Sequence, residues 1–276
     1  MIIETTPSQN TSATNSLKLS LVLGFSLMVI SGCNAPGSNL AMNSNNPFNL
    51  PNIANNNPGA ENNRPDPGNS GSTDHPNSPN QPPTSNLGEG CHSSDLNQIC
   101  LGIKYVTYKN TAGTVTATET EALENLRAIN QVWAQCRIQF QIDHYLAVNP
   151  ADFHLAYATA NLADLDDIRN SFEANDTLLI VTTGTWNRGG SLGNTGANAW
   201  TNMPGGGPYG VVLEQPVATY GNIIAHEIGH YLNLPHTNDT SALMNPIIYG
   251  YSTSIYTSQC STARTSAQND WPLMMR

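Results

Sequence analysis

A run of apolar residues that includes three histidines, IIAHEIGHYLNLPH, occupies residues 223–236. Its apolar residues recur at the spacing of one helix face, which predicts a helix over residues 219–232. On that helix His226 and His230 are four residues apart, so both imidazoles lie on one face, one turn apart. Glu227 lies at the flank of the same face. Two imidazoles at this spacing can bind one metal ion, and the carboxylate beside them can act as a general base.

His236 follows the expected end of this helix, so it becomes a third ligand only if the chain reverses direction near Asn233. Such a reversal needs a residue in the left-handed conformation, most commonly glycine and next asparagine, and Asn233 therefore predicts the turn. An aspartate is the alternative third ligand, at Asp239 or Asp270, since no glutamate follows Glu227. We favour His236 because neutral imidazole suits zinc and because its spacing matches the turn.

The whole pattern resembles the zinc-binding signature of the metzincin metalloproteases, with Asn233 in place of the usual glycine. Downstream, SALMNP at residues 241–246 resembles the methionine turn of that family. Its Ala-Leu-Met-x-Pro form is most similar to the matrixin branch, which usually has tyrosine where this chain has Asn245. The resemblance implies that Met244 forms an apolar floor under the zinc and does not bind it. It also implies a mixed sheet with long helices, an active-site helix and a small irregular C-terminal subdomain that ends in a helix.

We therefore expect a zinc-dependent endopeptidase that acts on proteins or peptides, with His226, His230 and His236 as the metal ligands. A metal-activated water would attack the scissile carbonyl while Glu227 accepts its proton as the general base. Calcium is common in matrixins, so the resemblance also allows a structural Ca²⁺, although the sequence has no compact loop of carboxylates that would require one. Two alternatives are a non-enzymatic surface adhesin that zinc only stabilises, and a zinc amidase that acts on cell-wall amides. Glu227 speaks against the adhesin, because a structural zinc site has no need of a base.

The resemblance also implies how a substrate is held. In the family an edge strand above the site pairs with the extended peptide, and residues 193–201 (GNTGANAWT) are the candidate here. Residues 247–257 would flank the scissile bond, and we expect Tyr249 and Tyr251 in that segment to be packing residues. Three other histidines are isolated and are assigned no metal: His92, His144 and His154.

Hydrophobic periodicity also predicts the strands and helices on either side of the histidine helix. Strands are predicted at residues 99–108, 138–142, 177–182, 197–201 and 209–214, and helices at residues 119–136, 155–172, 219–232 and 257–269. Thr118 and Glu121 are expected to form a capping box at the start of the first helix. The alternation of strands and helices predicts an α/β (α+β) fold with a mixed sheet.

The N-terminal region is typical of an exported lipoprotein. Residues 19–30 are mostly apolar and follow Lys18; the run is too short to span a membrane but suits a secretory signal. Ile-Ser-Gly-Cys at residues 30–33 resembles the bacterial lipobox, which implies a signal peptide over residues 1–32 and lipidation of Cys33. By resemblance to the bacterial sorting rule, the residue that follows Cys33 favours the outer membrane. We therefore expect a lipid-anchored protein of the bacterial cell envelope, at the outer membrane or the cell surface.

The amino-acid composition predicts a tether between the lipid anchor and the folded domain. Residues 33–90 contain the lipidated cysteine and a tether dominated by Asn, Pro, Gly and Ser, which is expected to be disordered; residues 91–276 form the zinc metallopeptidase domain. The formal net charge is −10, with 10 Lys and Arg against 20 Asp and Glu, which argues against binding to nucleic acid. We expect a monomer that touches the membrane only through its N-terminal lipid.

Four cysteines follow the predicted anchor, and an exported domain permits disulfides between them. Four cysteines allow three pairings. We favour the pairs Cys91–Cys100 and Cys136–Cys260, of which the second would join two helices; four free thiols are the alternative.

Overall fold

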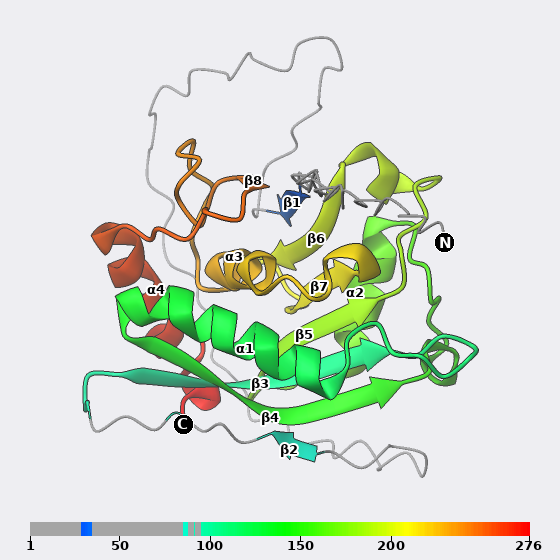
Figure 1. Cartoon of the computed structure of the whole chain (residues 1–276), viewed down its shortest axis with the longest axis horizontal. Helices are drawn as coiled ribbons and strands as arrows, with labels where there is room; N and C mark the ends of the chain where they lie inside the picture. Colours follow the sequence, from blue (N-terminus) through cyan, green and yellow to red (C-terminus); the bar gives the residue numbers. More distant parts are fainter. Residues whose placement is uncertain (1–28, 35–84, 88–90, 92–94) are drawn as a thin grey trace, which may run out of the picture.

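The computed structural model describes residues 29–34, 85–87, 91 and 95–276 (Figure 1). Most of the predicted signal peptide and most of the tether lie outside these residues, so both stay predictions. In the described part of the chain, no helix combines the length and the apolar character that crossing a membrane requires.

A mixed sheet forms the middle layer of the domain (Figure 1). Among the described residues it has eight strands, in the spatial order β2-β4-β3-β5-β7-β6-β1-β8. Their bounds, in chain order, are β1 Val29–Asn34, β2 Ser85–Leu87, β3 Ile99–Tyr108, β4 Ile138–Val148, β5 Leu178–Thr183, β6 Ala197–Asn202, β7 Val211–Glu214 and β8 Ile247–Ile248. Strands β4, β3, β5 and β7 are parallel to one another, and β6 is antiparallel to β7. Every residue of β5 is buried, as expected of a strand that is covered on both faces.

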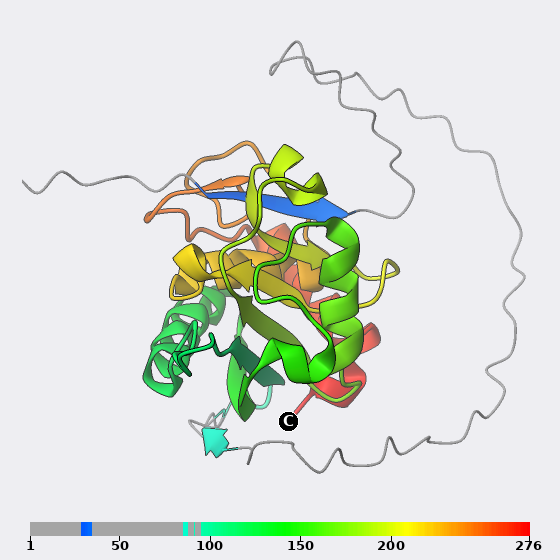
Figure 2. The ribbon, with the colours of Figure 1, turned by 90° about the vertical axis from the view of Figure 1, so that its right-hand side faces the viewer.

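Helices cover both faces of this sheet. Helix α1 (Glu119–Trp133) and helix α3 (Gly221–Tyr231) pack on one face, and α2 (Leu162–Phe172) packs on the other, as Figure 2 shows. Helix α4 (Thr257–Asn269) follows the irregular segment after α3. Short 3-10 helices occur at Ala134–Cys136, Pro150–Phe153, Ser191–Asn194, Gln215–Val217 and Pro272–Met274. Helix α3, which carries the histidine motif, lies beside α1 and packs against β6, β7 and β1.

The predicted strands and helices are present, with one correction. Thr118 and Glu121 form the expected capping box at the start of α1. The helix expected from residue 155 begins only at Leu162, so that prediction was wrong for residues 155–161. The reason is a cap, because the Asp164 carboxylate accepts a hydrogen bond of 2.9 Å from the main-chain N–H of Asn161 and fixes the helix start there.

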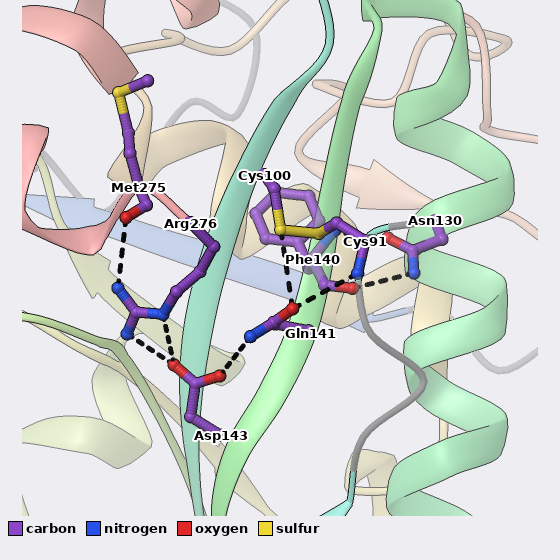
Figure 3. The surroundings of a disulfide bond; sticks show 8 residues. All are labelled: Cys91, Cys100, Asn130, Phe140, Gln141, Asp143, Met275 and Arg276. Carbon is purple, nitrogen blue, oxygen red and sulfur yellow. Dashed lines mark hydrogen bonds and ion pairs between the residues drawn. A yellow bond between two sulfur atoms is a disulfide. The ribbon is translucent and has the colours of Figure 1, made fainter. Parts of the chain in front are cut away.

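Both favoured disulfides are confirmed: Cys91–Cys100 and Cys136–Cys260. Figure 3 shows the first of them beside Gln141 of β4, whose side-chain oxygen accepts a hydrogen bond of 3.2 Å from the main-chain N–H of Cys91. The second joins the 3-10 helix that follows α1 to α4, so it connects two helices as predicted.

Removing the second disulfide should destabilise the domain more than removing the first. The two bonds span sequence separations of 124 and 9 residues, so the longer one restricts the unfolded chain far more. On chain entropy alone the losses are roughly 5 and under about 3 kcal/mol of unfolding free energy. Urea unfolding of the two paired Cys→Ala variants measures the difference. Equal losses of unfolding free energy in the two variants would contradict the prediction that Cys136–Cys260 stabilises the domain more.

Candidate metal centre

Close packing fixes the position of the histidine helix. Ten of the residues of α3, including His226, Glu227 and His230, are buried. Gly229 faces the sulfur of Met244, and a Cβ at that position would overlap it. The glycine inside the motif is therefore required by the close approach of the methionine turn, a constraint that the helix pattern alone did not reveal.

The turn after α3 has the predicted geometry. Asn233 has φ 66°, in the left-handed region. The main-chain N–H of Asn233 donates to the carbonyl of His230 and that of Leu234 donates to the carbonyl of Gly229, both at 2.9 Å. These two bonds are those of a Schellman motif, which ends the helix and turns the chain back. The turn returns His236 to the face that carries the other two imidazoles.

The structure brings the three histidines together. The Nε2 atom of His230 lies 3.0 Å from Nε2 of His226 and 3.1 Å from Nε2 of His236. Zinc–nitrogen bonds of about 2.0–2.1 Å in a tetrahedron separate two nitrogens by about 3.3 Å, which is close to these spacings. In the part of the chain that the structure describes, this is the only cluster of three or more His, Cys, Asp or Glu side chains that could hold a metal ion.

Hydrogen bonds on the outer side of two rings decide which nitrogen faces inward. Nδ1 of His226 lies 2.6 Å from the carbonyl oxygen of Leu243, and Nδ1 of His230 lies 2.7 Å from that of Leu234. A carbonyl only accepts, so each Nδ1 carries the proton and each neutral ring points an Nε2 lone pair inward. Lone pairs that converge at about 3 Å repel one another unless a cation lies among them. The donor set therefore fits a divalent metal.

Burial keeps these rings neutral. It lowers the pKa of His226 to about 3, and it holds the pKa of His230 well below its ordinary value. Desolvation of its ring by neighbouring groups also lowers the pKa of His236, although this residue is the most exposed of the three. Protons therefore compete weakly with a metal ion for these nitrogens at neutral pH.

The methionine turn packs against the histidine helix. Met244 is fully buried, in contact with Gly229, and its carbonyl accepts a hydrogen bond of 2.8 Å from the main-chain N–H of Thr237. The preceding residue, Leu243, supplies the carbonyl that fixes His226. This segment thus holds one imidazole through its main chain, a role that side-chain patterns in the sequence did not show.

Other predicted candidates lie outside the cluster. The carboxylate of Asp239 accepts hydrogen bonds from Ser241 and from the Tyr256 hydroxyl, which is 2.6 Å away, and the structure does not bring it into the histidine cluster. The rings of Tyr249 and Tyr251 stack on each other at 5.2 Å, but Tyr251 is exposed, so the expectation that it packs in the interior was wrong. The cluster also offers no support for a structural calcium ion, since its donors are nitrogens.

The predicted peptide edge, residues 193–201, is a strand only in part, because β6 begins at Ala197 after the 3-10 helix Ser191–Asn194. It is also not an edge strand, because β1 pairs with β6 on the side away from β7. Strand β1 lies between β6 and β8, parallel to β6 and antiparallel to β8. It also contacts α3, and Figure 1 shows it at that side of the helix. An extended segment can therefore pair with both β6 and β8 beside the histidine helix.

This arrangement is that of a metzincin-like metallopeptidase: a histidine pair on a helix, a third histidine after a tight turn, and a methionine turn packed against the helix. The chain belongs to metallopeptidase family M12: the family model described as "Metallo-peptidase family M12" (Reprolysin_5) matches residues 103–276. The match names M12, so the matrixin branch stays a prediction.

Among solved structures, the chain is similar to metalloproteinase-II from Bacteroides fragilis, with 12% identity and a TM-score of 0.44. That likeness covers 69% of this chain and 59% of the other. A structure of a chaperone–substrate complex is similar over 65% of this chain and 35% of that one, with 12% identity and a TM-score of 0.45. The chain thus spans less than two thirds of either protein. No curated protein matches it.

Proposed function

We propose that this chain is a zinc-dependent endopeptidase that hydrolyses peptide bonds of proteins outside the cytoplasm. His226, His230 and His236 would hold the ion, Glu227 would be the general base and Met244 the apolar floor. The observation that carries the proposal is the convergence of the three imidazoles, two of which have their outer N–H groups fixed on main-chain carbonyls. Membership of a metallopeptidase family supports the same activity.

The reaction needs a proton carrier next to the metal ligands. A zinc ion held by three neutral ligands lowers the pKa of a coordinated water to near 7 and polarises a carbonyl oxygen. Glu227 is fully buried and adjacent to His226 on α3. In our proposal its carboxylate accepts a proton as water attacks the scissile carbonyl carbon. The same carboxyl group then donates that proton to the departing amide nitrogen, which restores the carboxylate.

The position of β1 supports a peptide as the substrate. Between β6 and β8 the sheet accepts a six-residue strand, with ladder partners on both sides. Main-chain pairing of this kind binds extended peptides without selecting one sequence. An endopeptidase needs such a site, because the peptide must continue on both sides of the scissile bond.

The direct experiment is digestion of a mixed peptide library by the zinc-loaded chain, with the products read by mass spectrometry. The proposal predicts cleavage at internal bonds. An intact library would favour the adhesin, and hydrolysis confined to cell-wall amides would favour the amidase; either result would contradict an endopeptidase.

Releasing β1 should increase activity. While β1 pairs with β6, only the fraction of molecules with β1 displaced can bind an extended substrate there. In the uncleaved chain, which still contains residues 29–32, Ser31→Pro removes a main-chain N–H from the middle of a paired strand, so we expect kcat/KM for an extended peptide to rise severalfold. Ser38→Pro lies outside the strand and is the matched control. Equal kcat/KM values for both variants and the unaltered chain would contradict pairing of substrate at this position.

We further propose that the protein is anchored in the bacterial cell envelope through a lipid on Cys33. Cleavage before Cys33 would remove four of the six residues of β1 and leave the position beside β6 open. The tether of residues 33–90 would then hold the domain away from the membrane. Labelling of cells with a palmitate analogue tests the anchor, since Cys33→Ala should abolish incorporation; a variant that is labelled as strongly as the unaltered chain would refute it.

A further inference from the structure

Strand β6 carries the proposed peptide site, yet its own pairing to the rest of the sheet is short. It is antiparallel to β7 over three residue pairs, at Ala199, Trp200 and Thr201. A ladder of this length gives little independent stability, and its ends fray unless other groups hold them. A strand that receives a peptide must nevertheless stay in place while the peptide adds to its free edge.

Arg169 holds the C-terminal half of β6. Its side chain rises from α2 on the opposite face of the sheet and is 1% exposed. Its guanidinium donates to the carbonyl of Trp200 and to the carbonyl of Gly210, just before β7, at 2.8 Å each. Asp166 accepts from the same guanidinium at 2.9 Å and from the Asn202 amide at 3.2 Å. One buried cation therefore joins the end of β6 to the start of β7.

A second arginine holds the other end. Arg188, in the loop before β6, donates to the carbonyl of Ala197 at 2.7 Å and pairs with the carboxylate of Glu214. Glu214 ends β7, is 1% exposed and also accepts from the side-chain amide of Asn198. The first residues of β6 are thus fixed to the end of β7 by a buried carboxylate and its guanidinium partner.

The register of the free edge depends on this second contact. Along β1, Ile30 pairs with Ala197 and the next residue, Ser31, pairs with Ala199, so Asn198 is an extra residue on β6. Such a bulge redirects a strand, and its position decides which main-chain groups face an incoming peptide. Glu214 binds the side chain of Asn198 and so fixes the bulge at this residue.

We infer that Arg169 and Arg188 are positioning residues for peptide binding: each holds one end of β6 through a main-chain carbonyl, so that the strand presents a fixed edge to an extended substrate. This inference rests on the proposed function, in which β6 receives the peptide. A lysine cannot replace either residue, because only the planar guanidinium fork reaches a carbonyl and a second acceptor together.

The test compares Arg188→Lys and Arg169→Lys with a matched control, Arg264→Lys, in the zinc-loaded full chain. Arg264 also donates to main-chain carbonyls, those of Cys136 and Arg137, which belong to neither β6 nor β7. Two substrates are compared, a ten-residue peptide and a blocked dipeptide amide too short to pair along β6. Amide hydrogen exchange over residues 197–202 is measured in the same proteins.

For Arg188→Lys we expect KM for the long peptide to rise about tenfold, kcat to stay within about twofold, and kcat/KM for the dipeptide amide to be unchanged. Exchange over residues 197–202 should become faster. Arg169→Lys should also raise KM for the long peptide and speed the exchange. Arg264→Lys should change neither this KM nor the exchange over residues 197–202, even if it lowers Tm. Unchanged exchange in Arg188→Lys, or an equal rise in KM with Arg264→Lys, would overturn the inference. If no protein cleaves any peptide, the proposed function fails, and the exchange result alone decides whether the arginines hold β6.

Discussion

Glu227→Gln is expected to reduce kcat/KM for peptide hydrolysis by about a thousandfold while the protein keeps its metal. Glutamine has nearly the same shape as glutamate, so the fully buried site stays packed, but its amide cannot accept the proton of the attacking water. General acid–base catalysis contributes about 10²- to 10⁴-fold, which sets the size of the loss. The measurements are steady-state kinetics and zinc content by mass spectrometry. Glu227→Ala should lose activity to a similar degree.

Glu124→Gln is the matched control. It makes the same chemical change, but at an exposed position on α1 outside the site. It should retain full activity. A Glu227→Gln variant with bound zinc and unaltered kcat/KM would show that another group carries the proton.

His236→Ala is expected to weaken zinc binding by at least about a hundredfold. Structural zinc sites with four ligands bind with about 10–16 kcal/mol, so each ligand accounts for roughly 3 kcal/mol. His236 is the exposed ligand, so its removal should disturb packing less than removal of either buried histidine. Activity at limiting zinc should disappear. A competition titration with a chromogenic zinc chelator measures the affinity.

Removal of the metal should also lower the stability of the unaltered protein. Zinc at about a thousand times its Kd stabilises the folded state by about 4 kcal/mol, so a chelator should lower Tm by roughly 10 °C. The Tm of His236→Ala should barely respond to the chelator. His144→Ala, on β4 and outside the cluster, should behave like the unaltered chain; a His236→Ala protein that does the same would remove His236 from the ligand set.

The parts of the fold predicted correctly from the sequence are those fixed by local chemistry. Helix α1 is visible in its apolar period and in the capping box of Thr118 and Glu121. The turn that returns His236 is visible at Asn233, because few residues other than glycine and asparagine tolerate a left-handed backbone. The metal cluster was predictable for the same reason, since its spacing is set within one helix and one turn.

The features that escaped prediction depend on contacts between distant parts of the chain. Arg169 falls on the same face of α2 as the buried Leu165 and Phe172, but the sequence does not show what a buried cation there would bind. Its acceptors, the carbonyls of Trp200 and Gly210, come from distant segments of the chain. The start of α2 was placed too early, although Asn161 and Asp164 gave a capping signal. The pairing of β1 with β6 was not expected, because residues 29–34 were assigned to the signal peptide and the anchor.

X-ray absorption at the zinc edge of the zinc-loaded full chain tests the convergence of the three histidines most directly. We predict a first coordination shell with three imidazole nitrogens at about 2.0–2.1 Å, and with two in His236→Ala. A spectrum that contains fewer than three imidazoles in the unaltered protein, or that is the same in both proteins, would contradict the account.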